Sequence, residues 1–160
     1  MYSLSIPTPL GIFCMIIDET EHVVAAGFGL VQEVASRAAL ELPETAHNAE
    51  HPYARAIQAY FNKDYASLDA IPVRLAGTPF QQAVHTAMRT VAAGTTVSYT
   101  QLAKLAHRPA AIRAVASSCR TNKIILLVPC HRIIRSNGEI GQYVYGSDVK
   151  CRLLEHEIAV

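Results

Sequence analysis

Apolar residues in the first part of the chain form two runs that predict a β-hairpin. Residues 10–17 and 22–28 are rich in β-branched, small and aromatic side chains, and the polar segment 18–21 between them predicts a turn. Residues 31–41 predict a short helix, and the polar, turn-forming residues 43–51 predict a connector. This part of the chain shows no pattern that indicates chemistry.

Two prolines mark the starts of helices on either side of a predicted boundary. Pro52 precedes apolar residues at helical spacing, namely Ala54, Ile57 and Phe61. Residues 69–79 contain two prolines and a glycine, which predicts a linker between domains. A threonine cap followed by proline then predicts a helix over residues 78–92, in which His85 is expected to be packed rather than to bind a ligand.

A pair of short helices with a basic outer face predicts a helix-turn-helix. Ser98 and Gln101 form a capping box for the first helix. Its buried side is expected to be Leu102, Leu105 and Ala106. In the second helix, the predicted inner face is Ile112, Val115, Ala116 and Cys119. The predicted outer face is Arg113, Ser117 and Arg120. Many small side chains on this helix favour contact with nucleic acid, although an ordinary helical hairpin has the same spacing.

Residues 128–134 join the predicted end of a strand to a reactive pair of side chains. The run 124–128 is entirely aliphatic, which predicts a strand buried on both faces, and Pro129 predicts that the backbone leaves the sheet there. Cys130 follows with His131 beside it, and an imidazole near a thiol promotes formation of a nucleophilic thiolate. A buried structural cysteine beside an unrelated histidine is the simpler alternative.

The rest of the chain predicts a tight turn, a loop and a last helix. Asn137 and Gly138 are typical of a hairpin turn. The loop 141–146 has glycine at both ends and aromatic side chains within it, so it is a candidate wall for a pocket that holds a flat base. The last helix begins near Asp148. Its predicted inner face is Val149, Leu153, Leu154 and Ile158.

Charge is sorted along the chain, although the net charge is only +1. Residues 1–69 hold nine acidic and three basic side chains, residues 70–138 hold nine basic and no acidic ones, and residues 139–160 hold four acidic and two basic ones. A basic middle segment predicts a surface for a polyanion, usually nucleic acid. A solvated basic face without a partner is the alternative.

Cysteine spacing and hydropathy exclude several classes of protein. The four cysteines lack the paired spacing of a zinc site, so we predict free thiols and neither a metal nor a cofactor. The 160 residues, 51% of them hydrophobic, are enough for a core in one domain or two small ones. No apolar run approaches the roughly 20 residues of a membrane span, and Arg37, the first basic residue, comes too late for a secretory signal. We therefore predict a cytoplasmic protein.

The segment Val-Pro-Cys-His-Arg-Ile-Ile at residues 128–134 resembles, at every position, the active-site signature of the O6-alkylguanine-DNA alkyltransferases, also called methylated-DNA–protein-cysteine methyltransferases. Further blocks are similar to those of the family in order and spacing: residues 77–81, 97–103, 113–115 and 153–157. The resemblance is close over residues 72–158. Earlier residues resemble the family only in their number and in the hairpin.

This resemblance implies a mixed α/β fold with a small N-terminal ribonuclease-H-like domain that contains an antiparallel sheet, residues 1–72. It implies a C-terminal helix-turn-helix domain of the winged-helix type, residues 73–160. The implied activity is direct-reversal DNA repair, in which an alkyl group moves once and irreversibly from the O6 of guanine, or the O4 of thymine, to a cysteine. The implied partner is double-stranded DNA, bound in the minor groove with the damaged nucleotide flipped out.

The resemblance also implies a monomer without a cofactor, a membrane or an obligate protein partner. It would lie at the nucleoid of a bacterium or in the nucleus of a eukaryote. Cys130 would accept the alkyl group, His131 would act as base through a water, and Glu157 would orient the imidazole. Asn122 would connect the recognition helix to the cysteine turn, and Tyr99 would help to extrude and bind the nucleotide.

DNA contact is assigned by the same resemblance to Tyr99, Ala111, Ile112, Arg113, Ala114, Ser117 and Arg120. The base pocket is assigned to Val128, Pro129, Tyr143, Val144 and Tyr145. Arg113 would enter the duplex in place of the flipped nucleotide. The chain departs from the family at His85, where many members have tryptophan, at Ile112, where some have a smaller residue, and at Tyr145, where some have glycine. These changes concern packing, groove contact and pocket size.

Three other classes share some of these features. A helix-turn-helix regulator would use the basic helix without the thiol, so replacement of Cys130 by serine would leave its function intact. A protein that recognises damage without repairing it would lack the cysteine that this chain retains. A papain-like hydrolase has cysteine and histidine far apart in sequence and needs an oxyanion site, for which we find no candidate.

Overall fold

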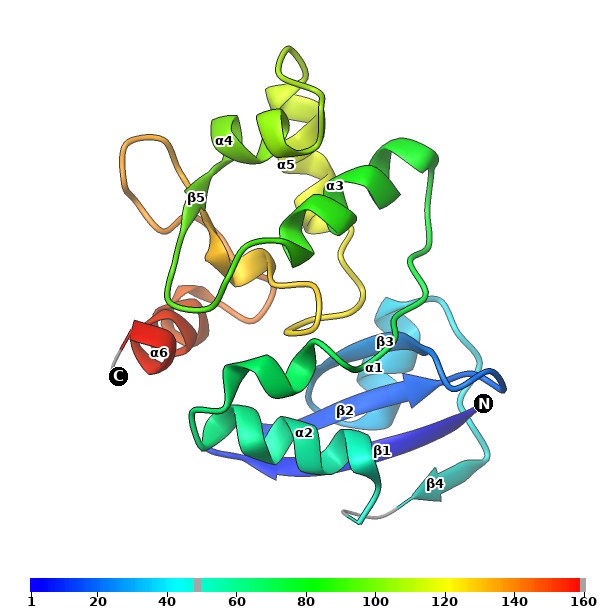
Figure 1. The fold of residues 1–160 in the computed structure, drawn as a ribbon. Coiled ribbons are helices and arrows are strands. Elements are labelled where there is room, and N and C mark those ends of the chain that lie inside the picture. Colours follow the sequence, from blue (N-terminus) through cyan, green and yellow to red (C-terminus); the bar gives the residue numbers. More distant parts are fainter. Residues whose placement is uncertain (48–49, 159–160) are drawn as a thin grey trace. The chain divides into compact units, whose positions relative to one another are not determined.

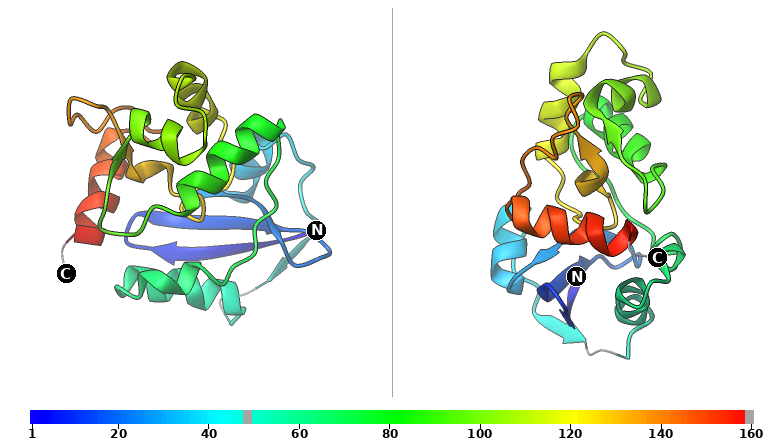
Figure 2. Two further views of the ribbon diagram at one scale, coloured as in Figure 1. Left: turned by 45° about the horizontal axis from the view of Figure 1, so that its top comes forward. Right: turned by 90° about the vertical axis from the view of Figure 1, so that its left-hand side faces the viewer.

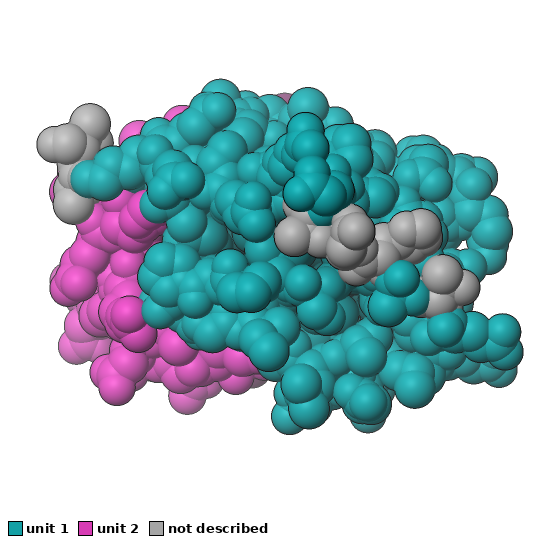
Figure 3. Space-filling model, turned by 90° about the horizontal axis from the view of Figure 1, so that it is seen from below, with its two compact units in different colours: residues 1–74, 123–127 teal, residues 75–122, 128–160 magenta. Residues whose placement is uncertain are grey.

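The computed structural model describes residues 1–47 and 50–158 (Figure 1). The chain divides into two compact units, which Figure 3 distinguishes by colour. The first unit contains Met1–Arg74 and Lys123–Leu127, and the second contains Leu75–Asn122 and Val128–Val160. Because Lys123–Leu127 belongs to the first unit while its neighbours belong to the second, no single cut in the sequence separates the units. The domain boundary between residues 72 and 73 stays a prediction.

A four-stranded sheet forms the centre of the first unit, with strand order β3-β2-β1-β4. Its strands are β1 (Tyr2–Thr8), β2 (Gly11–Ile17), β3 (Val23–Phe28) and β4 (Thr45–His47). The predicted hairpin of β2 and β3 is confirmed. The sequence pattern did not predict β1, which pairs antiparallel with β2, or β4, which runs parallel to β1 within the predicted connector. Residues 48–49 of that connector lie outside the described residues.

Helices cover both faces of this sheet (Figure 2). On one face, α1 (Val31–Arg37) packs Val34 against Cys14 and Ile16 of β2. On the other, α2 (Pro52–Phe61) packs against β1. Both faces of β2 are therefore buried, as its continuous apolar sequence requires. In α2, the predicted inner position Phe61 is only half-buried, and Tyr60 is fully buried instead. A short 3₁₀ helix, η1 (Tyr65–Leu68), follows.

The predicted strand over residues 124–128 is wrong. Isolated bridges join Ile124 to Ala26 and Val73 to Val23, so both segments line the outer edge of β3. The chain then turns at Leu126, which has a φ of +73°. All residues of this run are buried. Burial, and not strand structure, explains the aliphatic sequence.

The second unit contains four α-helices and a two-stranded parallel sheet among its described residues: α3 (Pro79–Arg89), α4 (Tyr99–Leu105), α5 (Ile112–Arg120), α6 (Ser147–Ile158), β5 (Val97–Ser98) and β6 (Ile133–Ile134). Both predicted caps are confirmed, since Thr78 caps α3 and Ser98 caps α4, each in a capping box with a glutamine. In α4, Leu105 is exposed, contrary to its predicted burial, and Ala103 is buried in its place.

The helix pair α4 and α5 forms the predicted helix-turn-helix, and both helices pack against α3. In α5, Val115 and Cys119 are buried as predicted, but Ile112 is exposed because it lies in the first turn of the helix. His85 of α3 is buried and donates a hydrogen bond from Nε2 to the carbonyl of Ser118 at 2.8 Å. The prediction that His85 is packed is confirmed.

Three further observations concern the cysteines, metal binding and membrane-spanning helices. All four cysteines are free thiols. Across residues 1–47 and 50–158, no group of three histidine, cysteine or acidic side chains is arranged to hold a metal ion. Within the same ranges, no helix has both the length and the apolar character needed to cross a bilayer.

Candidate active site

The chain turns sharply at the predicted cysteine. The Cys130 amide donates to the carbonyl of Val128 at 2.9 Å, and the Arg132 amide donates to the carbonyl of Pro129 at 3.0 Å. Residues Cys130–Arg132 form the short 3₁₀ helix η2. Cys130 and His131 could act together only if a turn followed the proline or a water bridged them, because adjacent side chains on a strand point to opposite faces. The structure contains that turn, with Cys130 partly exposed and His131 fully buried.

Asn122 connects the end of α5 to this turn. Its Nδ2 donates to the carbonyl of Val128 at 2.8 Å and to Sγ of Cys130 at 3.2 Å. The asparagine is buried and follows directly after the C-cap of α5. Because Sγ accepts this hydrogen bond, the contact favours a thiolate over a thiol.

Glu157 of α6 binds both His131 and Arg132 in a buried cluster. Its Oε1 accepts hydrogen bonds from Nε2 of His131 at 2.7 Å and from Nη2 of Arg132 at 2.8 Å, and its Oε2 accepts from Nε of Arg132 at 3.0 Å. Arg132 also donates from Nη1 to the carbonyl of Val91 at 2.7 Å. The sequence reasoning assigned Arg132 no role, although a basic residue directly after the Cys-His pair is visible in the sequence.

The protonation states in this cluster follow from its hydrogen bonds. Burial opposes ionisation of Glu157, but the hydrogen bonds from His131 and Arg132 outweigh it and hold the pKa of Glu157 well below its usual range. Burial lowers the pKa of His131 despite the attraction of Glu157, so the imidazole is neutral at pH 7.

The tautomer of His131 is therefore determined. An ionised carboxylate only accepts hydrogen bonds, so Nε2 of the neutral imidazole carries the hydrogen and Nδ1 is an acceptor. Nδ1 is buried and makes no hydrogen bond with the described residues. A buried acceptor of this kind can take up a proton.

Two charged residues lie on the buried face of α6, which corrects the predicted inner face. Ile158 is exposed, and the buried positions are Lys150, Leu153, Leu154 and Glu157. These positions lie at helical spacing i, i+3, i+4 and i+7, so the signal was present in the sequence. It was missed because charged side chains occupy a buried face only where they have partners, and Lys150 donates from Nζ to the carbonyl of Ile133 at 2.7 Å.

Tyr99, Cys119 and Lys150 lie near enough to Cys130 to interact with its charge. Burial raises the pKa of Tyr99, with further contributions from Cys119 and Cys130, so the phenol keeps its proton. Burial raises the pKa of Cys119 to about 12, and repulsion from Cys130 adds to the shift. Burial lowers the pKa of Lys150, whereas attraction to Cys130 favours its charged form. Near Cys130 there are thus a phenol that keeps its proton and a second thiol that stays neutral.

Five of the seven residues predicted to contact DNA are exposed on α5 and a sixth lies at its start, whereas Tyr99 is the first residue of α4 and is half-buried. The exposed members are Ile112, Arg113, Ala114, Ser117 and Arg120. Ala111 is the N-cap residue of this helix and is partly exposed. Arg113 is the longest side chain near the start of a helix otherwise rich in small residues.

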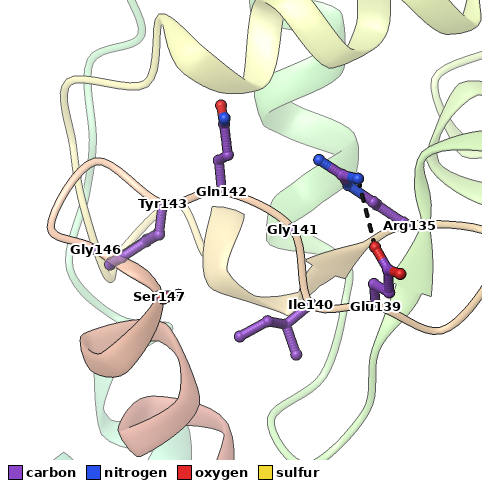
Figure 4. Close-up of a pocket in the computed structure, with 8 residues that line it drawn as sticks. All are labelled: Arg135, Glu139, Ile140, Gly141, Gln142, Tyr143, Gly146 and Ser147. Atoms are coloured by element: carbon purple, nitrogen blue, oxygen red, sulfur yellow. Dashed lines mark hydrogen bonds and ion pairs between the residues drawn. The ribbon is translucent and has the colours of Figure 1, made fainter.

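A cavity of about 560 Å³ lies along the loop that follows the cysteine turn (Figure 4). It is lined by Arg135, residues 139–143, Gly146 and Ser147. Of the predicted pocket residues, Tyr143 lines this cavity, and Tyr145 packs against Tyr143 with ring centroids 6.0 Å apart. Val128 and Pro129 are buried and Val144 is exposed.

Comparisons with known proteins agree with this geometry. The family model for the DNA-binding domain of 6-O-methylguanine DNA methyltransferase matches residues 79–159. The bifunctional transcriptional activator/DNA repair enzyme Ada of Escherichia coli is 46% identical over 87 residues, which are 54% of this chain and 25% of that protein. The methylated-DNA–protein-cysteine methyltransferase of Methanosarcina acetivorans is 33% identical over 162 residues and is matched over 98% of both chains.

The similarity extends to the three-dimensional structure. The crystal structure of the OGT protein of Mycobacterium tuberculosis in complex with DNA has a TM-score of 0.81 and 28% identity, and the match covers 99% of this chain and 94% of that one. The chain spans only a quarter of the length of the first two curated relatives that it matches and 59% of the third. The family model and the match to the Methanosarcina protein over nearly its whole length nevertheless show that the chain belongs to the 6-O-methylguanine DNA methyltransferase family.

Proposed function

We propose that this protein repairs DNA by moving the alkyl group from O6 of guanine to Sγ of Cys130, in one irreversible turnover. The observation that carries the proposal is the arrangement around the thiol. Sγ accepts a hydrogen bond from Asn122 at 3.2 Å, and the adjacent His131 is neutral, buried and fixed by Glu157 at 2.7 Å. This set of groups prepares a thiolate, which a DNA-binding protein without chemistry would not need.

The thiol proton leaves first. His131 accepts it at Nδ1 through a bridging water, because Nε2 is committed to Glu157. The imidazolium that forms is stabilised by the ionised carboxylate of Glu157, and the thiolate is stabilised by the hydrogen bond from Asn122. Arg132 holds the carboxylate in place with two hydrogen bonds, so it acts as a positioning residue.

The alkyl carbon then moves between two nucleophilic atoms. A carbon–sulfur bond forms at Cys130 while the bond between that carbon and O6 breaks, and the electron pair of the broken bond stays on the guanine. The proton that His131 took from the thiol passes through water to the base, which completes the restored guanine and returns the imidazole to its neutral form. Tyr99, whose raised pKa keeps its hydroxyl protonated, is the donor that hydrogen-bonds the base during this step. The O4 of thymine offers the same chemistry.

The base must leave the duplex for this reaction. A stacked and paired guanine does not expose O6 to in-line attack by a thiolate, and extrusion of the nucleotide removes this barrier. Exposed residues of α5 supply the DNA contact, with Arg113 filling the space of the extruded nucleotide in the minor groove. The protein acts as a monomer in the compartment that holds the genome, which is the cytoplasm of a bacterium or the nucleus of a eukaryote.

Each molecule acts once. The thioether at Cys130 does not hydrolyse readily, and an unactivated thioether does not give up its alkyl group to a second thiol. The alkylated protein is therefore the final product.

The decisive experiment uses a duplex oligonucleotide that contains one O6-methylguanine. After incubation with an excess of DNA, intact-protein mass spectrometry should find one methyl group per chain, mapped to Cys130 by proteolysis. Cys130→Ser should gain none but should still bind the duplex. Multiple turnover, transfer to another residue, or no transfer would refute the proposal, and unchanged biological function in Cys130→Ser would favour a regulator.

A further inference from the structure

An ion pair at one end of the cavity is not used by the proposed mechanism. Arg135 and Glu139 both line the cavity and lie at the two ends of a tight turn. A hydrogen bond from the Arg135 amide to the Glu139 carbonyl, 2.8 Å long, closes this turn. Nη1 of Arg135 lies 3.4 Å from Oε2 of Glu139 (Figure 4). Both side chains are more than half exposed, at 52% and 65%.

This ion pair is weakly held. The separation is at the long limit of a hydrogen bond, solvent screens the two charges, and exposed pairs of this kind contribute about 0 to 1 kcal/mol. A stronger anion can therefore replace Glu139 as the partner of Arg135 at little cost. The guanidinium fork matches a phosphate group, which it binds through two hydrogen bonds.

The position of Arg135 specifies which anion it would meet. Gly141 lies between Arg135 and Tyr99, because a Cβ atom at Gly141 would be 3.6 Å from Cγ of Arg135 and 3.8 Å from the Tyr99 hydroxyl. Arg135 also acts electrostatically on Tyr99. Arg135 thus lies beside the residue that helps to extrude the nucleotide and on the wall of the cavity, where its guanidinium can reach the backbone of that nucleotide.

We propose that Arg135 binds a phosphate that flanks the extruded nucleotide, and that Glu139 is a substitute anion which holds the guanidinium in place when DNA is absent. This inference rests on the proposed function and adds a binding residue to it. Binding of the phosphate displaces Glu139 from Arg135. Glu139 opposes that binding, since its carboxylate competes with the phosphate.

The salt dependence of DNA binding tests the proposal. Each phosphate contact contributes about 0.9 to the slope of log affinity against log salt concentration. Arg135→Gln should therefore reduce the slope by about one and weaken binding about tenfold at low salt. Glu139→Gln should strengthen binding. Arg55→Gln is the matched control, because Arg55 forms a similar exposed pair with Glu50 in the other unit and should leave the slope unchanged.

A modified substrate locates the phosphate. In duplexes with one O6-methylguanine, a single neutral methylphosphonate replaces the phosphate on the 5′ or the 3′ side of that nucleotide. One of these duplexes should abolish the difference in affinity between wild type and Arg135→Gln, whereas a methylphosphonate several base pairs away should preserve it. An unchanged slope in Arg135→Gln, or a difference that persists on both modified duplexes, would overturn the inference even if wild type transfers the methyl group. Absence of transfer in wild type would instead refute the proposed function.

Discussion

Replacement of Glu157 by glutamine tests the roles of the buried cluster, because the substitution removes a charge with almost no change in shape. The amide oxygen can keep the place of Oε1, which accepts from His131 and from Nη2 of Arg132. The amide NH₂ group then faces Nε of Arg132, which now donates to Oε2 at 3.0 Å. One hydrogen bond becomes a contact between two donors, and the guanidinium is left buried without a counter-charge.

The substitution should lower both the stability of the fold and the rate of methyl transfer. Breaking a buried ion pair costs about 3 to 5 kcal/mol of the free energy of unfolding, which lowers the melting temperature by about 10 °C for a chain of this length. The imidazolium formed by His131 also loses a charged partner worth about 1.5 to 3 kcal/mol. The single-turnover rate of methyl transfer should therefore fall by about 10- to 100-fold.

A double variant separates the two effects. In Glu157→Gln with Arg132→Gln, no buried charge is left without a partner, so the melting temperature should recover in part, whereas the rate should stay low. Glu155→Gln is the control, since Glu155 is exposed on the same helix and should react at the wild-type rate. A wild-type rate in Glu157→Gln, or a rate that recovers together with stability in the double variant, would show that Glu157 has only a structural role.

Two further predictions concern Asn122 and the buried histidines. Asn122→Asp places a carboxylate about 3.2 Å from the Cys130 sulfur, and its repulsion of the thiolate should slow methyl transfer at least about a hundredfold in single-turnover assays. Burial lowers the pKa of His85 and of His131, so the unfolded chain takes up protons below about pH 6.5 that the folded chain does not. The free energy of unfolding should therefore be fully present above that pH and fall as the pH decreases from 6.5, by at most about 1.4 kcal/mol per pH unit for each histidine.

Each of these predictions has a control. Asn122→Ser removes the amide without adding charge and should lose less activity than Asn122→Asp; equal rates in the two variants would contradict the electrostatic explanation. Urea unfolding of His85→Gln between pH 7.5 and 5.5 should show a shallower decrease than wild type. An equal decrease in both proteins would show that His85 does not contribute.

The sequence predicted correctly those elements that depend on interactions between residues close together in the chain. The capping boxes at Thr78 and Ser98 were readable because each cap and its glutamine lie three residues apart. The short distance between β2 and β3 made their hairpin equally readable. Strand β4 was not predicted, because its three residues form a strand only by pairing with β1, which is distant in the sequence.

The wrong predictions concern residues that are surrounded by parts of the chain distant in sequence. The run ending at Val128 is aliphatic because it is buried, and a buried turn has the same composition as a buried strand. Lys150 and Glu157 lie on the inner face of α6 because Lys150 donates to the carbonyl of Ile133 and Glu157 accepts from His131 and Arg132, and no such partner is visible from the helical pattern alone. The Cys-His pair could be found from sequence, whereas the pairing of Arg132 with Glu157 required the fold.

The central claim is that Cys130 accepts one alkyl group directly from DNA. The most direct measurement is the intact mass of the protein over time after mixing with a duplex that carries O6-methylguanine labelled with ¹³C in the methyl group. We predict that one labelled methyl group appears per chain, on Cys130 alone, while an equal amount of guanine is restored in the DNA. Restored guanine without label on the protein, or label on any other residue, would contradict the claim.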